Sequence, residues 1–269
     1  MTIHVTDVAI VGGGMVGGAL ALGLAQQGFT VTVLEKAAPP AFDPASAPDV
    51  RISAISAASV GLLKSLGVWD AIRAMRVHAY RRLETWEWES AHVAFDAAEL
   101  KLPELGYMVE NKVLQWGLWQ ALAAHEAVTL RVGSELKTMQ RGETQTALHL
   151  REGETIHARL VIGADGANSQ VREMAGIGVH AWQYQQSCML ISVECADDPG
   201  DSTWQQFTPS GPRAFLPLFD HWASLVWYDA PARIRQLQSM TMAQLQQEIA
   251  SHFPARLGRV TPQAAGAFP

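Results

Sequence analysis

A glycine-rich stretch near the N-terminus constrains the fold more than any other part of the sequence. Residues 8–11 form an apolar run that is typical of a buried parallel strand. Gly12, Gly14 and Gly17 follow at the spacing G-x-G-x-x-G, and a helical stretch then leads to a second apolar run that ends at Glu35. The order strand, glycine turn, helix, strand and acidic residue predicts a dinucleotide-binding β-α-β unit.

Each residue of this motif has a physical reason to be there. Gly12 allows the tight turn out of the strand, Gly14 lets a pyrophosphate approach the backbone, and Gly17 lets the helix pack close to the strand. The N-terminus of the helix directs free N–H groups and a positive dipole at the phosphates. Glu35, which Lys36 follows, ends the second strand, where a carboxylate can accept hydrogen bonds from both hydroxyls of a ribose. We assign these five residues to the cofactor site.

Three other interpretations of this part of the chain are weaker. A glycine-rich surface for helix packing does not account for Glu35. Residues 8–25 carry no charge and are long enough to span a membrane, but their six glycines argue against one continuous helix. Residues 1–7 contain no Lys or Arg, so a cleaved signal peptide is not expected.

Composition excludes several classes of protein. The net charge of −6 disfavours nucleic acid as a partner, because binding phosphates requires a basic surface. The two cysteines are too few for a disulfide framework, which favours a cytoplasmic protein. The nine histidines are scattered without the spacing of a metal-binding motif, so no metal site is predicted.

Periodicity and turn residues predict the remaining elements of the chain. Helices are expected at 57–66, 69–75, 112–125 and 242–253, and strands at 81–89, 93–95, 128–132, 135–141, 146–151, 155–158, 160–162, 189–194, 203–208, 213–217 and 222–228.

Their order predicts two intertwined domains. Residues 1–80 and 108–180 would form a Rossmann-like nucleotide-binding domain. Residues 81–107 and 181–269 would form an antiparallel-sheet domain for the substrate. The expected fold class is therefore α/β with an α+β insertion.

A second motif follows an apolar strand at residues 160–162. Taken alone, Asp-Gly after a strand is an ordinary turn. Here it is part of a longer pattern, G-A-D-G-x-x-S-x-V-R, which is formed by Gly163, Ala164, Asp165, Gly166, Ser169, Val171 and Arg172.

With both motifs present, the sequence resembles the class A flavoprotein aromatic hydroxylases. The segments 49–56, 80–88 and 214–218 are similar to the ubiquinone-biosynthesis branch of that family. The resemblance implies that the first motif binds the ADP half of FAD. It also implies that Asp165, Gly166 and Arg172 lie near the flavin and the pyridine nucleotide, and that Arg51 lies over the cofactor.

The resemblance also implies an activity. A member of this branch would use NAD(P)H and O₂ to hydroxylate a prenylated benzoquinol or phenol in ubiquinone biosynthesis. Such a protein would be cytoplasmic, and the resemblance leaves open peripheral association with the inner membrane or with a ubiquinone-biosynthesis complex. The catalytic residues stay unknown at this point, since His180, His221 and Tyr228 each have a structural or surface role as the simpler explanation.

One departure from the family is serious. Its third motif, G-D-A-A-H followed by P-x-x-G-x-G, is not found in these 269 residues, and Gly200-Asp201 follows a polar loop instead of a buried strand. We therefore expect a C-terminally truncated member with an incomplete FAD site and no turnover. The alternative is a non-catalytic nucleotide-binding or interaction module of a biosynthetic complex. An NAD-dependent oxidoreductase is disfavoured by the second motif and by the long antiparallel insertion.

Overall fold

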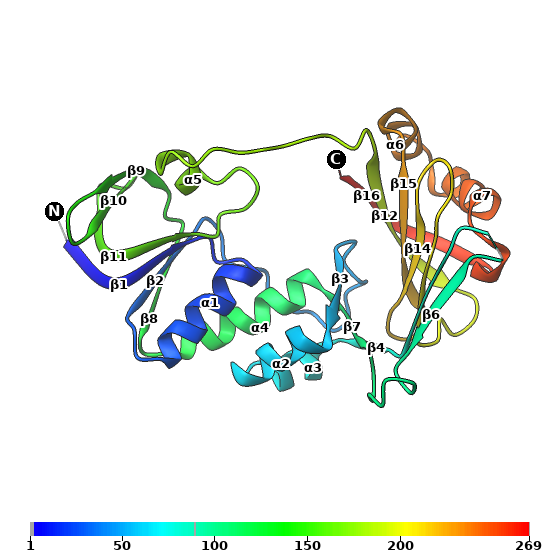
Figure 1. The fold of residues 1–269 in the computed structure, drawn as a ribbon, viewed down its shortest axis with the longest axis horizontal. Helices are drawn as coiled ribbons and strands as arrows, with labels where there is room; N and C mark the ends of the chain where they lie inside the picture. Colours follow the sequence, from blue (N-terminus) through cyan, green and yellow to red (C-terminus); the bar gives the residue numbers. More distant parts are fainter. Residues whose placement is uncertain (1–2, 89, 269) are drawn as a thin grey trace. The chain divides into compact units, whose positions relative to one another are not determined.

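The chain is divided between two units, each built from three segments. The computed structural model describes residues 3–88 and 90–268 (Figure 1). The first unit contains residues 1–42, 62–72 and 112–181, and the second contains residues 43–61, 73–111 and 182–269.

These segments differ from the predicted domain boundaries, because residues 43–61, 73–80 and 108–111 were expected in the first domain. The reason is a small antiparallel sheet of the second unit, which was not predicted. In it β7 (Gly106–Glu110) lies between β3 (Ile52–Ser56) and β4 (His78–Tyr80). Because β7 pairs with β3 and β4, the segments that contain these three strands belong to the second unit.

The first unit contains a six-stranded sheet. Its strands in spatial order are β8 (Val128–Val132), β2 (Val31–Glu35), β1 (Ile3–Val11), β11 (Thr155–Gly163), β10 (Thr146–Leu150) and β9 (Leu136–Arg141). The first four strands run parallel, whereas β10 and β9 are antiparallel to their neighbours. The sequence pattern predicted separate strands at 155–158 and 160–162, but the structure has a single strand, in which Leu160 is 53% exposed instead of buried.

Two long helices of the first unit pack against each other. They are α1 (Met15–Gln26) and α4 (Asn111–Ala124), and a Cβ added to Gly18 of α1 would lie 3.5 Å from Leu118 of α4. The short helix α5 (Gln170–Met174) follows β11. Residues of α2 (Ala57–Ser65) and α3 (Trp69–Met75) are divided between the two units.

The second unit contains a seven-stranded sheet. Its spatial order is β16 (Val260–Phe268), β12 (Ser187–Cys195), β15 (Trp222–Asp229), β14 (Arg213–Pro217), β13 (Ser202–Gln206), β5 (Arg82–Trp86) and β6 (His92–Asp96). All neighbours are antiparallel except β13 and β5. Glu89, at the end of the predicted strand 81–89, lies outside the described residues.

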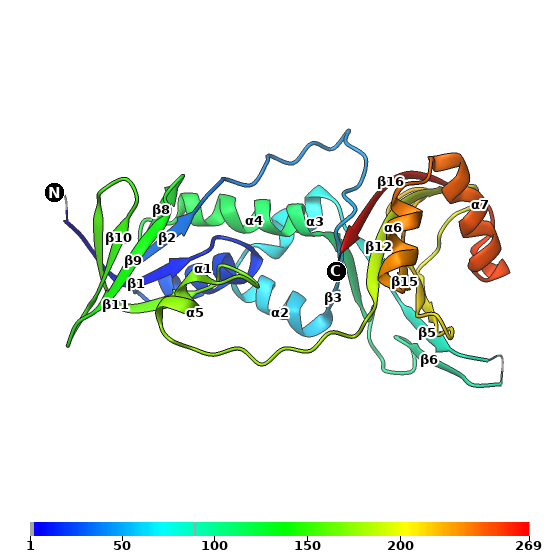
Figure 2. The same ribbon diagram turned by 90° about the horizontal axis from the view of Figure 1, so that it is seen from above.

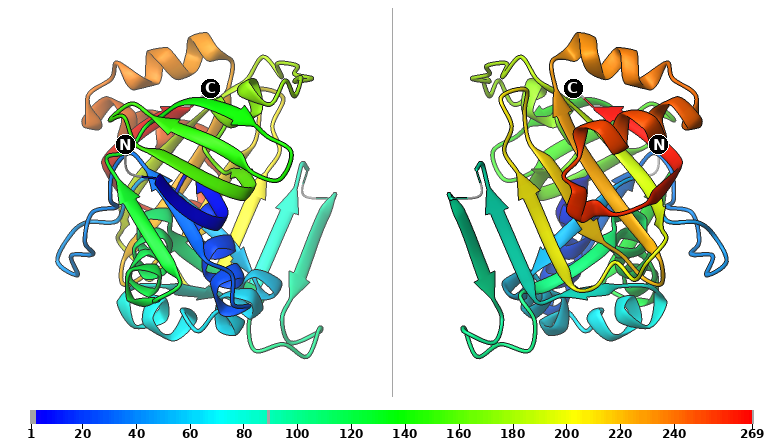
Figure 3. Two further views of the ribbon diagram at one scale, coloured as in Figure 1. Left: turned by 90° about the vertical axis from the view of Figure 1, so that its left-hand side faces the viewer. Right: turned by 90° about the vertical axis from the view of Figure 1, so that its right-hand side faces the viewer.

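Helices α6 (Pro231–Gln238) and α7 (Met242–His252) cover one face of this sheet, and a short 3₁₀ turn at Ala255–Leu257 follows (Figure 3). Met189, Ile191 and Val193 alternate along β12 and pack in one core cluster with Leu237 and Ile249 of the helices. The period of two in the strand therefore matches the apolar faces of the helices. Thr241 begins α7 with a capping box, in which its hydroxyl and the side chain of Gln244 bond each other's backbone N–H groups.

Glu84 is the buried centre of a charge cluster that joins several strands of this unit. Its carboxylate accepts hydrogen bonds from Arg82 Nε at 3.0 Å, Arg256 Nη2 at 3.2 Å and Ser202 Oγ at 3.1 Å, and His92 Nε2 lies 2.8 Å away. The hydrogen bond from Arg256 is the main cause that lowers the pKa of Glu84 to about 2, and it outweighs the burial that would raise the pKa.

We predict an acid-sensitive contribution of Glu84 to stability. Because the folded pKa lies below the unfolded value, the contribution is complete above about pH 4.5 and is lost as the pH falls toward 2. It should amount to roughly 2–3 kcal/mol at neutral pH. Melting temperatures of wild type and Glu84→Gln from pH 2 to 7 check this: the two curves should converge at low pH. A constant gap would contradict the assignment.

Candidate cofactor site

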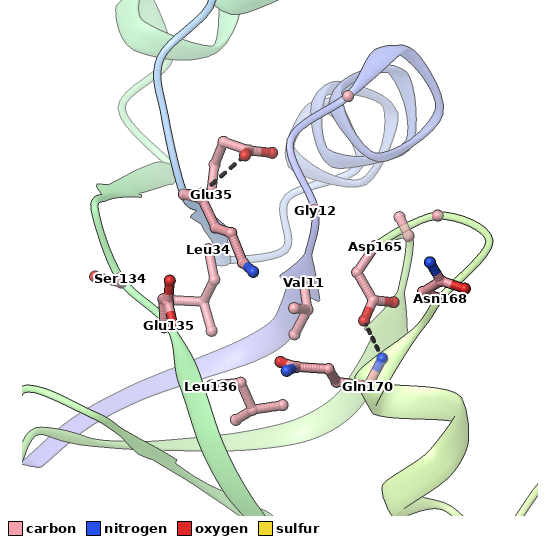
Figure 4. Close-up of a pocket in the computed structure, with 14 residues that line it drawn as sticks. Val11, Gly12, Leu34, Glu35, Ser134, Glu135, Leu136, Asp165, Asn168 and Gln170 are labelled. Carbon is pink, nitrogen blue, oxygen red and sulfur yellow. Dashed lines mark hydrogen bonds between the residues drawn. The ribbon is translucent and has the colours of Figure 1, made fainter. Parts of the chain in front are cut away.

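A pocket of about 510 Å³ lies in the first unit where three parallel strands end (Figure 4). β2 and β11 pair with β1 on opposite sides, so the strand order of the sheet changes direction at β1. Such a switch point is where open α/β sheets bind ligands. The lining residues are Val11, Gly12, Gly14, Leu34, Glu35, Lys36, Ser134, Glu135, Leu136, Ala164, Asp165, Gly166, Asn168 and Gln170.

Two glycines of the first motif are required by close backbone packing. Gly12 has a φ of 103°, and a Cβ on it would lie 2.3 Å from the carbonyl oxygen of Ala164. A Cβ on Gly17 would lie 1.9 Å from the carbonyl oxygen of Gly12. Both distances are far shorter than any real contact, so the turn and the first turn of α1 can meet only without side chains at these positions.

Gly14 differs from both. A Cβ built there would have no other described atom within 4 Å, and the residue lines the pocket. It is the N-cap of α1, and no side chain in the described part of the chain caps this helix or places an acid in its first turn. The positive end of the helix dipole therefore faces open space. A negatively charged phosphate group placed there would be stabilised by the dipole and by the free N–H groups.

Glu35 and Lys36 also line the pocket, beside the glycine turn. The Glu35 carboxylate accepts hydrogen bonds from the backbone N–H of Gly13 at 2.6 Å and of Lys36 at 2.8 Å. These bonds fix the carboxylate at the end of β2. Each carboxylate oxygen has two lone pairs, so Glu35 keeps the capacity to accept hydrogen bonds from a ligand.

The second motif contributes a capped turn to the same pocket. Asp165 accepts hydrogen bonds from Ser169 Oγ at 2.5 Å and from the backbone N–H of Gln170 at 2.7 Å. Burial would raise the pKa of Asp165, but these bonds outweigh it and lower the pKa. Gly166 lies beside it with a φ of 86°. The aspartate thus holds the start of α5 in place while it lines the pocket.

The remaining two predicted residues are not among those that line the pocket. Arg172 donates a hydrogen bond to the carbonyl oxygen of Ala167 at 2.9 Å and lines another groove, on the other side of β11. Arg51 belongs to the second unit, where its guanidinium lies 5.1 Å from the centre of the Phe268 ring, and its expected place over the cofactor stays a prediction. The structure therefore brings Gly12, Gly14, Glu35, Lys36, Asp165 and Gly166 together in one pocket, and Gly17 packs behind the turn.

Eight of the fourteen lining residues were not predicted as site residues. Val11, Leu34 and Ala164 lie at or directly after the ends of the strands of the two motifs. Asn168 and Gln170 lie inside the second motif, so its loop geometry could have indicated them. Ser134, Glu135 and Leu136 carry no motif, and they reach the pocket because β8 pairs with β2. Among residues 3–88 and 90–268, no group of three or more His, Cys, Asp or Glu side chains is placed to hold a metal ion.

We expect Glu35→Ala to weaken binding of ADP, because a hydrogen bond to a charged group contributes about 1.5–3 kcal/mol. It should also lower the melting temperature, because it removes the acceptor for Gly13 N–H. Glu35→Gln is the matched control, since its amide oxygen can still accept that bond. Calorimetric titration with ADP and thermal melts of both variants test this. Unchanged affinity in both variants would exclude Glu35 from the site.

Comparison with known proteins identifies the family. The family described as FAD binding domain matches residues 5–268. The chain is 76% identical over all 269 residues to 3-demethoxyubiquinol 3-hydroxylase of Escherichia coli, and it spans 69% of that protein. It is 36% identical over 260 residues to ubiquinone hydroxylase UbiL of Rhodospirillum rubrum, of which it spans 60%. The mitochondrial ubiquinone biosynthesis monooxygenase of Homo sapiens is 34% identical over 255 residues, and the chain spans 54% of it.

Solved structures share the fold. PqsL of P. aeruginosa, in complex with 2-aminobenzoylacetate, superposes with a TM-score of 0.77 at 18% identity, over 97% of this chain and 74% of PqsL. Aklavinone-11 hydroxylase, in complex with FAD and aklavinone, gives a TM-score of 0.73 at 21% identity, over 100% of this chain and 54% of the hydroxylase. Together with the sequence matches, these findings confirm the predicted resemblance: the chain belongs to the FAD-binding flavoprotein monooxygenases, in their ubiquinone-biosynthesis branch.

Proposed function

We propose that the protein acts as an FAD-dependent monooxygenase that hydroxylates a prenylated benzoquinol in ubiquinone biosynthesis. The observation that carries the proposal is the 76% identity, over the whole chain, with a 3-demethoxyubiquinol 3-hydroxylase. The chain spans 69% of that relative, so the activity proposed is that of the whole protein.

The pocket of the first unit fits the ADP half of FAD. The opening beside Gly14 and the uncapped start of α1 would receive the pyrophosphate, and Glu35 would accept hydrogen bonds from the ribose. Lys36, Asp165 and Gly166 complete the wall of the site. When bound, FAD supplies the redox chemistry that lets O₂ react with an electron-rich ring, with NAD(P)H as the source of electrons.

For the substrate, we favour a 2-polyprenyl-3-methyl-6-methoxy-1,4-benzoquinol. This ring is a ubiquinol that lacks one methoxy group, which matches the name of the Escherichia coli relative. Hydroxylation would place an oxygen at the ring position that lacks the methoxy group. The polyprenyl tail makes such a molecule a membrane lipid.

The lipid character of this substrate supports a cytoplasmic protein that associates peripherally with the inner membrane or with a ubiquinone-biosynthesis complex. No described helix is both long enough and apolar enough to cross a membrane.

A non-catalytic nucleotide-binding module is the second candidate. It is favoured by one observation: the residues assigned to the pocket account for the ADP half of a dinucleotide, and none of them is assigned to the substrate. In that case the pocket would bind ADP, but the whole protein would not oxidise NAD(P)H.

A chimera separates the two candidates. The 269 residues would be joined to the part of the Escherichia coli relative that they do not match. Bound flavin would be measured by absorbance, and NAD(P)H oxidation would be followed with and without a short-chain demethoxyubiquinol. We expect a yellow chimera with substrate-dependent oxidation and a hydroxylated product, and weak flavin binding by the 269 residues alone. A colourless chimera that binds ADP but oxidises no NAD(P)H would support the module instead.

A further inference from the structure

The last strand of the seven-stranded sheet, β6, has one unpaired edge. It pairs with β5, and within residues 3–88 and 90–268 no strand bonds its other side (Figure 2). Ala97 N–H, directly after β6, donates to the carbonyl oxygen of Arg81 at 2.9 Å, toward β5. Backbone groups alternate in direction along a strand, so the N–H groups of His92, Ala94 and Asp96 point away from β5. The proposed cofactor pocket is in the other unit, so it leaves this edge without a role.

The edge strands of the two large sheets differ in how they are protected. Lys137 lies on β9, Arg131 lies on β8, and Pro262 interrupts β16. Charged side chains and proline on an edge strand hinder its pairing with another chain. β6 contains no lysine, arginine or proline, and its Val93 and Phe95 are each 51% exposed on one face of the strand. Among these four edges, β6 is therefore the one best suited to accept another strand.

The sequence of β6, His-Val-Ala-Phe-Asp, complements itself when two copies run antiparallel about Ala94. The outward backbone groups of the two strands then meet, and the two Ala94 residues exchange hydrogen bonds. His92 of one copy lies opposite Asp96 of the other, where the imidazole can donate a hydrogen bond to the carboxylate. Val93 lies opposite Phe95 of the second copy, and pairs of β-branched and aromatic side chains stabilise neighbouring strands. Any other antiparallel register separates His92 from Asp96.

We propose that the outer edge of β6 binds the same edge of a second copy of the chain, in a two-fold symmetric dimer that joins the two seven-stranded sheets. One surface then serves both partners, as in most homodimers. The same symmetry brings the turn with Trp88, which is 65% exposed, to the end of the other β6 that Leu100, 57% exposed, follows. The proposal concerns assembly, so it holds or fails independently of the proposed activity.

Charged substitutions at the facing positions test both the partner and the register. Val93→Lys combined with Phe95→Glu places opposite charges across the two-fold axis, whereas Val93→Lys combined with Phe95→Lys places like charges there. Both double variants change the same two exposed positions, so each is the control for the other. Sedimentation equilibrium would be measured over a range of concentrations, for the 269 residues and for the chimera described above. We expect wild-type dimers in both chains, and a Kd at least about tenfold higher for the like-charge variant than for the opposite-charge variant.

Proline substitution gives a second test. Ala94→Pro removes an outward N–H and no hydrogen bond to β5, so it should give a folded monomer, whereas Ala94→Ser should remain a dimer. Thermal melts check that both variants fold.

Three results would overturn the proposal. The first is an equal Kd for the two charged variants. The second is a monomeric chimera in which the Ala94 amide is protected from hydrogen exchange, which would assign the edge to another segment of the protein. The third is a monomeric chimera in which that amide exchanges rapidly, because the edge would then have no partner.

Discussion

Gly14→Val is expected to abolish binding of ADP and FAD while leaving the fold intact. A Cβ at this position meets no other described atom within 4 Å, and the backbone φ of −68° is one that any L-residue adopts. The added side chain therefore costs the free protein little. It projects from the N-cap of α1, where the pyrophosphate would lie against the backbone, so the ligand and the valine cannot occupy the site together.

The measurement is a calorimetric titration with ADP, accompanied by a thermal melt. Affinity should fall at least about 100-fold, which corresponds to about 2.7 kcal/mol. Gly61→Val is the matched control, because Gly61 in α2 also has open space around its Cβ position but does not line the pocket. Affinity close to wild type in Gly14→Val would remove the first motif from the binding site.

Gly17→Ala should have the opposite effect and destabilise the chain before any ligand is present. The new methyl group would lie 1.9 Å from the carbonyl oxygen of Gly12, and that oxygen belongs to the backbone of the turn. Relief requires α1 to move away from the end of β1. Overpacking of this kind typically costs about 1–3 kcal/mol and occasionally more. A backbone clash this close should reach at least the upper end of that range.

The neighbouring glycine provides the control. A Cβ on Gly18 would lie 3.5 Å from the Cβ of Leu118, which is an ordinary packing distance. Gly18→Ala should therefore be neutral or stabilise α1, because alanine is favoured over glycine in a helix by about 1 kcal/mol. Chemical denaturation of both variants decides the matter. Equal stabilities for Gly17→Ala and Gly18→Ala would show that the close approach of helix and turn is not required.

The sequence alone determined the local β-α-β unit and the chemistry of its loops. The pattern from Gly12 to Glu35 spans few residues, and its positions meet local structural requirements. These are a positive φ at Gly12, an open N-cap at Gly14 and a strand end at Glu35. The capped turn at Asp165 is equally local, since all its hydrogen bonds lie within six residues. For the same reason, the two motifs were enough to indicate the family, which the comparisons then confirmed.

Several elements escaped prediction because no periodic pattern marks them. β7 is buried at all five positions, so its sequence shows no alternation. β16 contains Pro262 and Gly266, which lower the strand propensity, and it forms by pairing with β12. α6 is short and polar on average, and it is held by Ile234 and Leu237 in the core beneath it.

Only the tertiary structure decided on which side of the sheet or of a strand each residue lies. Ser134 to Leu136 line the cofactor pocket because β8 pairs with β2, more than ninety positions away in the sequence. Arg172 belongs to the second motif, yet it lines the groove on the other side of β11. Leu160 lies in an apolar run that predicted burial, but it is 53% exposed. Pairing between distant strands depends on the whole chain, whereas turn geometry and helix capping depend on neighbours in sequence. Turns and helix caps can therefore be predicted from a single sequence, and the pairing of distant strands cannot.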